Sequence, residues 1–204
     1  MQLTAQPSLS TPRFSTENLR AHFGGTQDFE WRGEWPLADD QARAAVLIPL
    51  VTREGGITVL LTRRADHLYH HPGQISFPGG RVEARDASSV NTALRETQEE
   101  IGLAPESVEL LGELPAYATS TGFHVSPVVG FVRPPFELKV DAFEVAEVFE
   151  VPLSFVANMA NYQRHRVERM GSMRHFLAVP YAGRFIWGAT AGMLAMLAAF
   201  LEIK

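Results

Sequence analysis

The segment from Gly79 to Leu103, GGRVEARDASSVNTALRETQEEIGL, constrains the fold most tightly, because it has the pattern of one well-defined amphipathic helix. Asp86 or a following serine can cap the start of this helix, and Gly102 suits the position just past its end. Residues suited to a buried stripe recur at helical spacing: Val90, Leu94, Thr97 and Ile101. We therefore predict a helix over Ala87–Ile101 that packs its stripe against a sheet.

Three glutamates, Glu96, Glu99 and Glu100, are predicted to share a different face of this helix, at spacings i, i+3 and i+4. Like charges at these spacings repel, at a cost of roughly 0.2–0.5 kcal/mol per pair. A divalent cation reverses that effect, because hard cations take carboxylate oxygens as ligands. An ordinary solvated helix face is the alternative interpretation of the three glutamates alone.

The string as a whole resembles the Nudix box, G-x5-E-x7-R-E-U-x-E-E-x-G-U, in which U is a bulky apolar residue. The match runs from Gly80 through Arg95-Glu96-Thr97-Gln98-Glu99-Glu100-Ile101-Gly102-Leu103. It has two departures at its start, since Asp86 stands where the box has Glu and eight residues separate it from Arg95. Thr97 also occupies a position where a larger apolar residue is usual.

This resemblance implies a metal-dependent hydrolase that cleaves a pyrophosphate bond with Mg²⁺ or Mn²⁺. It implies that Glu96 and Glu100 are the main metal ligands, that Glu99 is a further ligand or a base, and that the Gly80 carbonyl completes the shell. Arg95 lies four residues before Glu99, a spacing that allows a pair orienting this carboxylate. An ordinary surface salt bridge is the alternative for Arg95.

A general base must take the proton of the attacking water. Nudix enzymes often supply an acid from a loop remote from the box. Besides Glu99, the candidates here are Glu144 and Glu147, in the segment Asp141–Leu153. Solvated carboxylates at a strand end are the alternative interpretation for both.

The segment before the box, LLTRRADHLYHHPGQISFPGG from Leu60 to Gly80, resembles the signature of the coenzyme A pyrophosphatase subgroup, LLT-x-R-[SA]-x3-R-x3-G-x3-FPGG. Tyr69 occupies the position of the second arginine. The resemblance implies coenzyme A as the substrate. Arg64 and Arg63 are candidates for phosphate contacts, and Arg63, His70 and His71 are candidates to replace the second arginine. Solvated residues at a strand end are the alternative for both arginines. An apolar groove beside Phe77 and the C-terminal helix would suit the pantetheine arm.

A second basic stretch precedes the C-terminal apolar segment and offers Arg166 and Arg174 for the 3′-phosphate of coenzyme A; a solvated face is the alternative. It consists of Arg164, His165, Arg166, Arg169, Arg174 and His175. The histidines of the first segment, His67, His70 and His71, are more typical of loop residues than of metal ligands.

The composition limits the class of protein. A formal net charge of −5 among 204 residues gives no basic field for nucleic acid. The absence of cysteine excludes disulfides and thiolate chemistry. The first twenty residues lack a basic start followed by an apolar run, so we expect no signal peptide. We expect a cytoplasmic monomer or homodimer that acts on a small molecule.

The expected fold belongs to the α/β class and is a Nudix-like α/β/α sandwich with a mixed sheet. Residues 1–43 form an N-terminal extension with a short helix around Glu17–Phe23, and residues 44–204 form the hydrolase domain. The strands are predicted from apolar runs, the first two as a hairpin: Ala44–Val51, Ile57–Thr62, Ile75–Phe77, Val108–Glu113, Val125–Val132 and Val145–Val151.

The stretch from Phe185 to Leu201 has no charged residue. A membrane span needs about 20 strongly apolar residues. This stretch is rich in Ala and Gly and includes Thr190, so we predict a buried C-terminal helix and no membrane association.

The sequence thus predicts hydrolysis of coenzyme A or its derivatives to 3′,5′-ADP and 4′-phosphopantetheine or acyl-phosphopantetheine. A Nudix enzyme for ADP-ribose, a dinucleotide or a nucleoside triphosphate is the first alternative. A binding module without catalysis and a membrane-anchored protein are the others.

Overall fold

A computed structural model describes residues 14–25, 29–31, 42–169 and 172–202. Much of the expected N-terminal extension lies outside these residues. Its predicted helix lies inside them and is confirmed as α1, Thr16–Gly24, which begins after Ser15. The Ser15 side chain accepts a hydrogen bond from the Asn18 N–H and so caps the helix.

The larger sheet has eight strands and is mixed, as predicted. Its strands are β1 (Ala42–Arg53), β2 (Gly56–Arg64), β3 (Ile75–Ser76), β4 (Gly79–Arg81), β5 (Val108–Glu113), β6 (Tyr117–Ala118), β7 (Phe123–Val132) and β8 (Val145–Pro152). The central order is β3-β2-β1-β7-β5, with β4 on β1, β6 on β7 and β8 on β2. Strands β1 and β7 are parallel and the other pairs are antiparallel. Every predicted strand is present; β4 and β6 were not predicted.

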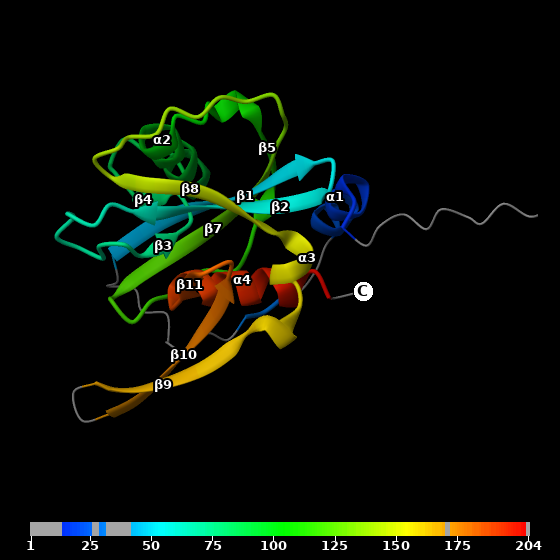
Figure 1. Ribbon diagram of the computed structural model, residues 1–204. Coiled ribbons are helices and arrows are strands. Elements are labelled where there is room, and N and C mark those ends of the chain that lie inside the picture. The colour runs from blue at the N-terminus through cyan, green and yellow to red at the C-terminus, as the bar shows by residue number, and fades with distance from the viewer. Residues whose placement is uncertain (1–13, 26–28, 32–41, 170–171, 203–204) are drawn as a thin grey trace, which may run out of the picture.

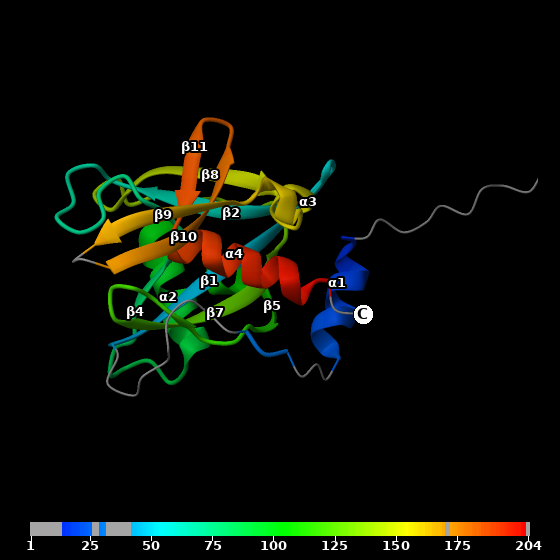
Figure 2. The ribbon, with the colours of Figure 1, turned by 90° about the horizontal axis from the view of Figure 1, so that it is seen from below.

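The two faces of β1 bury different clusters, because successive side chains of a strand point to opposite faces. Ala45 and Leu47 pack with the residues of α2, Ser89–Ile101, whereas Ile48 and Leu50 pack with those of α4, Ala189–Phe200. Figures 1 and 2 show α2 and α4 on opposite faces of the larger sheet. Helix, sheet and helix form the predicted sandwich.

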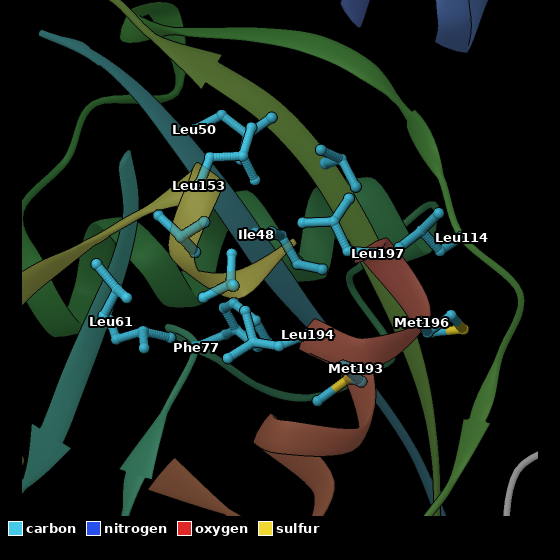
Figure 3. Packing of buried hydrophobic residues seen from close by; sticks show 14 of the residues in the cluster. Ile48, Leu50, Leu61, Phe77, Leu114, Leu153, Met193, Leu194, Met196 and Leu197 are labelled. Atoms are coloured by element: carbon cyan, nitrogen blue, oxygen red, sulfur yellow. The ribbon is translucent and has the colours of Figure 1, made fainter. Parts of the chain in front are cut away.

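The charge-free C-terminal stretch is not one helix. Its first residues belong to β11, Arg184–Trp187, and only Ala189–Phe200 is helical. The prediction of a buried helix is confirmed for α4, whose Met193, Leu194 and Leu197 belong to one buried cluster with Ile48 and Leu50 of β1 (Figure 3). Among the described residues, no helix is long and apolar enough to cross a membrane.

A second, three-stranded sheet was not predicted. It consists of β9 (Gln163–Arg169), β10 (Ser172–Tyr181) and β11, in the order β11-β10-β9. The basic stretch of the sequence lies on its β9–β10 hairpin, whose charged residues hide the strand alternation. Short helical turns complete the chain: Pro105–Ser107, α3 (Leu153–Val156) and Met159–Asn161.

Candidate active site

Two glycines of β4 let a helix approach the sheet closely. Strand β4 pairs with β1, with Gly80 opposite Ala45 and Gly79 opposite Val46. Gly79 has φ 153°, and a Cβ there would overlap the Ala45 carbonyl. A Cβ on Gly80 would overlap the carboxylate of Glu96. Glycine at position 80 therefore leaves the space that this carboxylate occupies against the backbone.

The N-cap of helix α2 lies two residues after the earliest predicted cap, Asp86, at one of the serines that were also predicted as caps. Ser88 is the N-cap, since its side chain accepts from the Asn91 N–H, and Gly102 ends the helix in the left-handed conformation at φ 71°. The buried residues are Thr92, Ala93, Thr97, Glu100 and Ile101. Val90 and Leu94 of the predicted stripe are only half-buried.

The three glutamates of α2 differ in exposure, which argues against the alternative interpretation of one solvated helix face. Glu99 is exposed, Glu96 is half-buried and Glu100 is buried, with 6% of its surface exposed. The Glu100 Oε2 accepts a hydrogen bond from the Gly79 N–H over 3.2 Å, and its Oε1 lies 3.9 Å from the Arg64 Nη1.

Burial makes the charged form of these carboxylates costly. It raises the pKa of Glu100 to about 8, and the neighbouring charges of Glu144 and Glu96 add to the rise. Burial also raises the pKa of Glu96, against the opposing effect of Arg95. Nearby Glu99 and Glu144 raise the pKa of Glu96 further. The electrostatic effects show that Glu144 lies near both Glu96 and Glu100.

Arg95 is the centre of an ion-pair network. Its Nη1 donates to Glu96 Oε1 and to Glu99 Oε2, each over 2.9 Å, so the pairing expected from the i, i+4 spacing is present. Its Nε and Nη2 donate to Asp86. The hydrogen bonds from Arg95 lower the pKa of Asp86 well below its ordinary value.

Asp86 is therefore a partner of Arg95, a role that the sequence analysis missed. The signal was available, because Asp86 stands in the acidic position of the box. Its carboxylate also accepts from the Thr92 hydroxyl and from the Glu83 N–H, both over 2.9 Å.

The two predicted loop acids lie in different surroundings. Glu144 closes a turn that begins at Asp141, whose N–H donates to the Glu100 carbonyl over 2.9 Å. Glu147 pairs with Arg184 of β11 and lies 3.9 Å from the Arg63 Nε. Of these two acids, only Glu144 lies near the carboxylates of α2. No feature of the sequence pointed to the pairing of Glu147 with Arg184.

Arg63 and Arg64 also separate, because neighbours on a strand point to opposite faces. Arg64 faces Glu100, whereas Arg63 donates to Asp66 over 2.7 Å and lies near Glu147. Phe77 is only 2% exposed and packs in the cluster that includes α4. It belongs to the core beside the site and offers almost no surface to a ligand.

Arg166 and Arg174 lie on opposite faces of the β9–β10 hairpin. Arg166 pairs in register with His175, and Arg174 with Val167. Arg166 is two residues from Arg164, the register partner of Leu177, so it shares the face that packs toward the core. In Figures 1 and 2 the hairpin extends to the same side of the molecule as the loop after β2.

The donor set suits a hard divalent cation. Buried, mutually repelling carboxylates stand against the backbone of Gly79 and Gly80, and oxygen ligands are those that Mg²⁺ and Mn²⁺ prefer. Within the described part of the chain, no three acidic or histidine side chains already converge as a metal cluster. Arg95 holds Glu96 and Glu99 in its own ion pairs.

Comparison with known proteins gives a consistent set of relatives. A family model described as the NUDIX domain matches residues 41–168. An "Uncharacterized Nudix hydrolase NudL" of Enterobacter sp. (strain 638) is 44% identical over 165 residues, covering 81% of this chain and 85% of the relative. Its counterpart in Salmonella newport (strain SL254) is 43% identical over 166 residues, with coverages of 81% and 85%.

Solved structures with a similar chain path include a Nudix hydrolase from M. smegmatis, RenU, with a TM-score of 0.49 and 24% identity over 57% of this chain and 74% of that one. A C. elegans Ap4A hydrolase binary complex has a TM-score of 0.47 and 19% identity, covering 54% of this chain and 80% of that one.

Proposed function

Since this chain belongs to the Nudix hydrolase family, whose model matches residues 41–168, we propose that it hydrolyses the pyrophosphate bond of coenzyme A or its derivatives. The products are 3′,5′-ADP and 4′-phosphopantetheine or its acylated form. The alternative substrates are ADP-ribose, dinucleotides and nucleoside triphosphates.

The observation that supports this proposal most directly is the meeting of Arg64 with Glu100. Arg64 belongs to the segment that resembles the coenzyme A signature, and its Nη1 lies 3.9 Å from the Glu100 Oε1. The end of the same segment provides the Gly79 N–H that donates to Glu100. The segment that resembles the coenzyme A signature thus contacts the acidic helix at Glu100.

The carboxylates of Glu96 and Glu100, with Glu99 and the Gly80 carbonyl, would hold Mg²⁺ or Mn²⁺. A bound cation of this kind neutralises phosphate oxygens and lowers the pKa of a coordinated water. Glu96 is already adjacent to the Gly80 backbone, as the overlap of its carboxylate with a Cβ there indicates.

The side chains of the chain itself perform the remaining tasks. Glu144, which lies near Glu96 and Glu100, accepts the proton of the attacking water. Arg64 binds a diphosphate oxygen through charge-assisted hydrogen bonds. Arg95 orients Glu96 and Glu99 through the pairs already present.

Incubation of the protein with a panel of substrates tests the proposal. The panel contains coenzyme A, 3′-dephospho-coenzyme A, ADP-ribose, a diadenosine polyphosphate and ATP, each with Mg²⁺, with Mn²⁺ and with excess chelator. Mass spectrometry of the products identifies the broken bond. Coenzyme A should have the highest kcat/KM, and equal values across the panel would contradict the substrate assignment.

A further inference from the structure

Two exposed aromatic rings from distant segments meet beside the carboxylates. Phe143 is 67% exposed although it is a large apolar residue, and the His67 side chain is exposed as well. Their ring centroids are 4.9 Å apart and their planes are inclined at 60°. This pair, the Phe143–His67 platform, leaves ring surface open to solvent.

The turn that carries Phe143 is held from two sides. The Asp141 N–H donates to the Glu100 carbonyl over 2.9 Å, which ties the turn to the end of α2. The Asp141 Oδ1 accepts from the Phe143 N–H over 2.9 Å. On the other side, the Ala65 N–H donates to the Glu144 carbonyl over 2.8 Å. The Phe143 ring is therefore exposed on a turn whose backbone is held in place by hydrogen bonds.

The loop that carries His67 is also closed at its base. The Arg64 N–H donates to the Gln74 carbonyl over 3.0 Å, and the Leu68 N–H donates to the Ala65 carbonyl over 3.3 Å. Both rings are thus fixed on backbone that is bonded to the neighbouring strand or turn, which preorganises a contact surface.

The platform lies one residue from the proposed base and three residues from Arg64. Phe143 directly precedes Glu144, and consecutive Cα atoms are about 3.8 Å apart. If the diphosphate of a substrate lies at Glu96, Glu100 and Arg64, the groups attached to it reach the neighbouring platform. The exposed rings of the platform favour a substrate group that binds by packing against an aromatic ring.

We propose that the Phe143–His67 platform binds the base of the nucleotide half of the substrate by stacking. The inference rests on the proposed function, because it takes the diphosphate to lie at the carboxylates. A purine has a flat π-face for the Phe143 ring, and its ring nitrogens can exchange a hydrogen bond with the imidazole of His67.

The test compares the binding of two probes that differ only in the base, AMP and ribose 5-phosphate. Equilibrium dialysis with Mg²⁺ measures both dissociation constants without requiring turnover. The wild-type protein should bind AMP about ten-fold more tightly, near the weaker end of the range of base–aromatic stacking. Phe143→Ala should abolish this preference, and Phe143→Trp should retain it.

Tyr69→Ala is the matched control. Tyr69 is 93% exposed on the same loop as His67, but its ring contacts His70 and not Phe143. This variant should keep the preference for AMP. Since Phe143 is exposed, the melting temperature of Phe143→Ala should equal that of the wild type, which excludes unfolding as the cause of lost binding.

Three outcomes overturn the proposal: equal binding of the two probes by the wild type, a preference retained in Phe143→Ala, or its equal loss in Tyr69→Ala. If Phe143→Ala instead weakens only the binding of 4′-phosphopantetheine, the ring covers the pantetheine arm and the base lies elsewhere. Hydrolysis of the substrate panel is a separate readout, so failure of the platform leaves the proposed function standing.

Discussion

Arg95 and Asp86 are joined by two parallel hydrogen bonds, from Nε to Oδ1 over 3.0 Å and from Nη2 to Oδ2 over 2.9 Å. The Asp86 side chain is only 4% exposed. The arrangement leaves the Nη1 of Arg95 to face Glu96 and Glu99. Asp86 therefore sets the direction in which Arg95 presents its remaining donor to the carboxylates of α2.

Asp86→Asn should lower metal affinity or kcat by about 10- to 100-fold, the range observed when residues that orient metal ligands are changed. Glu83→Gln is the matched control, because Glu83 lies 3.7 Å from the same guanidinium but is much more exposed. Its kinetics should stay near those of the wild type. Titration of activity with Mn²⁺ measures both variants, and equal behaviour of the two would argue against an orienting role for Asp86.

Glu96→Gln and Glu100→Gln should each lower kcat by at least about 10²–10³-fold, as the loss of a single electrostatic stabiliser does in other active sites. Excess chelator should abolish the activity of the wild type. Circular dichroism should show a preserved fold, since the shape of each side chain is nearly kept. Undiminished turnover in chelator or in either variant would rule out the metal site.

Glu144→Gln and Glu147→Gln should differ, although only two residues separate them. Glu144 lies near the carboxylates of α2, so its variant should lose about 10²–10⁴-fold in kcat while still binding Mn²⁺. Glu147 pairs with Arg184, so its variant should have a lower melting temperature and a kcat close to that of the wild type. Kinetics and metal titration together distinguish the roles; a near-native kcat for Glu144→Gln would assign the base to Glu99 or another group.

Arg166→Ala should reduce the preference for coenzyme A over 3′-dephospho-coenzyme A, whereas Arg174→Ala should leave it unchanged. The register places Arg166 on the core-side face of the hairpin and Arg174 on the opposite face. Loss of one hydrogen bond to a charged group corresponds to about ten- to hundred-fold in the ratio of the two kcat/KM values. The reverse pattern would assign the 3′-phosphate to the outer face of the hairpin.

Acid should weaken the attachment of α1. Hydrogen bonds from Arg20, over 2.6 Å and 3.1 Å, and from Arg133 lower the pKa of Glu109 from 4.5 to about 2. Because the folded-state pKa is the lower one, this stabilisation is complete above the unfolded-state value and is lost as the pH falls from about 4.5 to 2.

Glu109→Gln should therefore lower the melting temperature at pH 7, and the difference from the wild type should shrink as the pH falls toward 2. Calorimetry across this range measures the effect. Glu106→Gln, at an exposed position three residues away, is the control. A difference that does not depend on pH would exclude the ion pair as its source.

Local patterns of the chain predicted much of this structure. Apolar runs marked β1, β2, β5, β7 and β8, and the stripe with Gly102 at its end marked α2, because strand and helix periodicities depend on residues close in sequence. Spacing also predicted the Arg95–Glu99 pair. The small sheet of β9–β11 was missed, since its charged and aromatic residues follow no simple alternation.

Contacts between distant segments were decided only by the tertiary structure. Glu144 and Glu147 look equivalent in the sequence, yet one lies near Glu100 and the other reaches Arg184. Neighbouring Arg63 and Arg64 separate to the two faces of β2. The residue types and spacings of the box thus specify the acidic helix, whereas the packing of α2 and α4 on opposite faces of one sheet determines which side chains meet. The physical reason is that elements far apart in the chain set the burial of each side chain, and burial sets the cost of its charge.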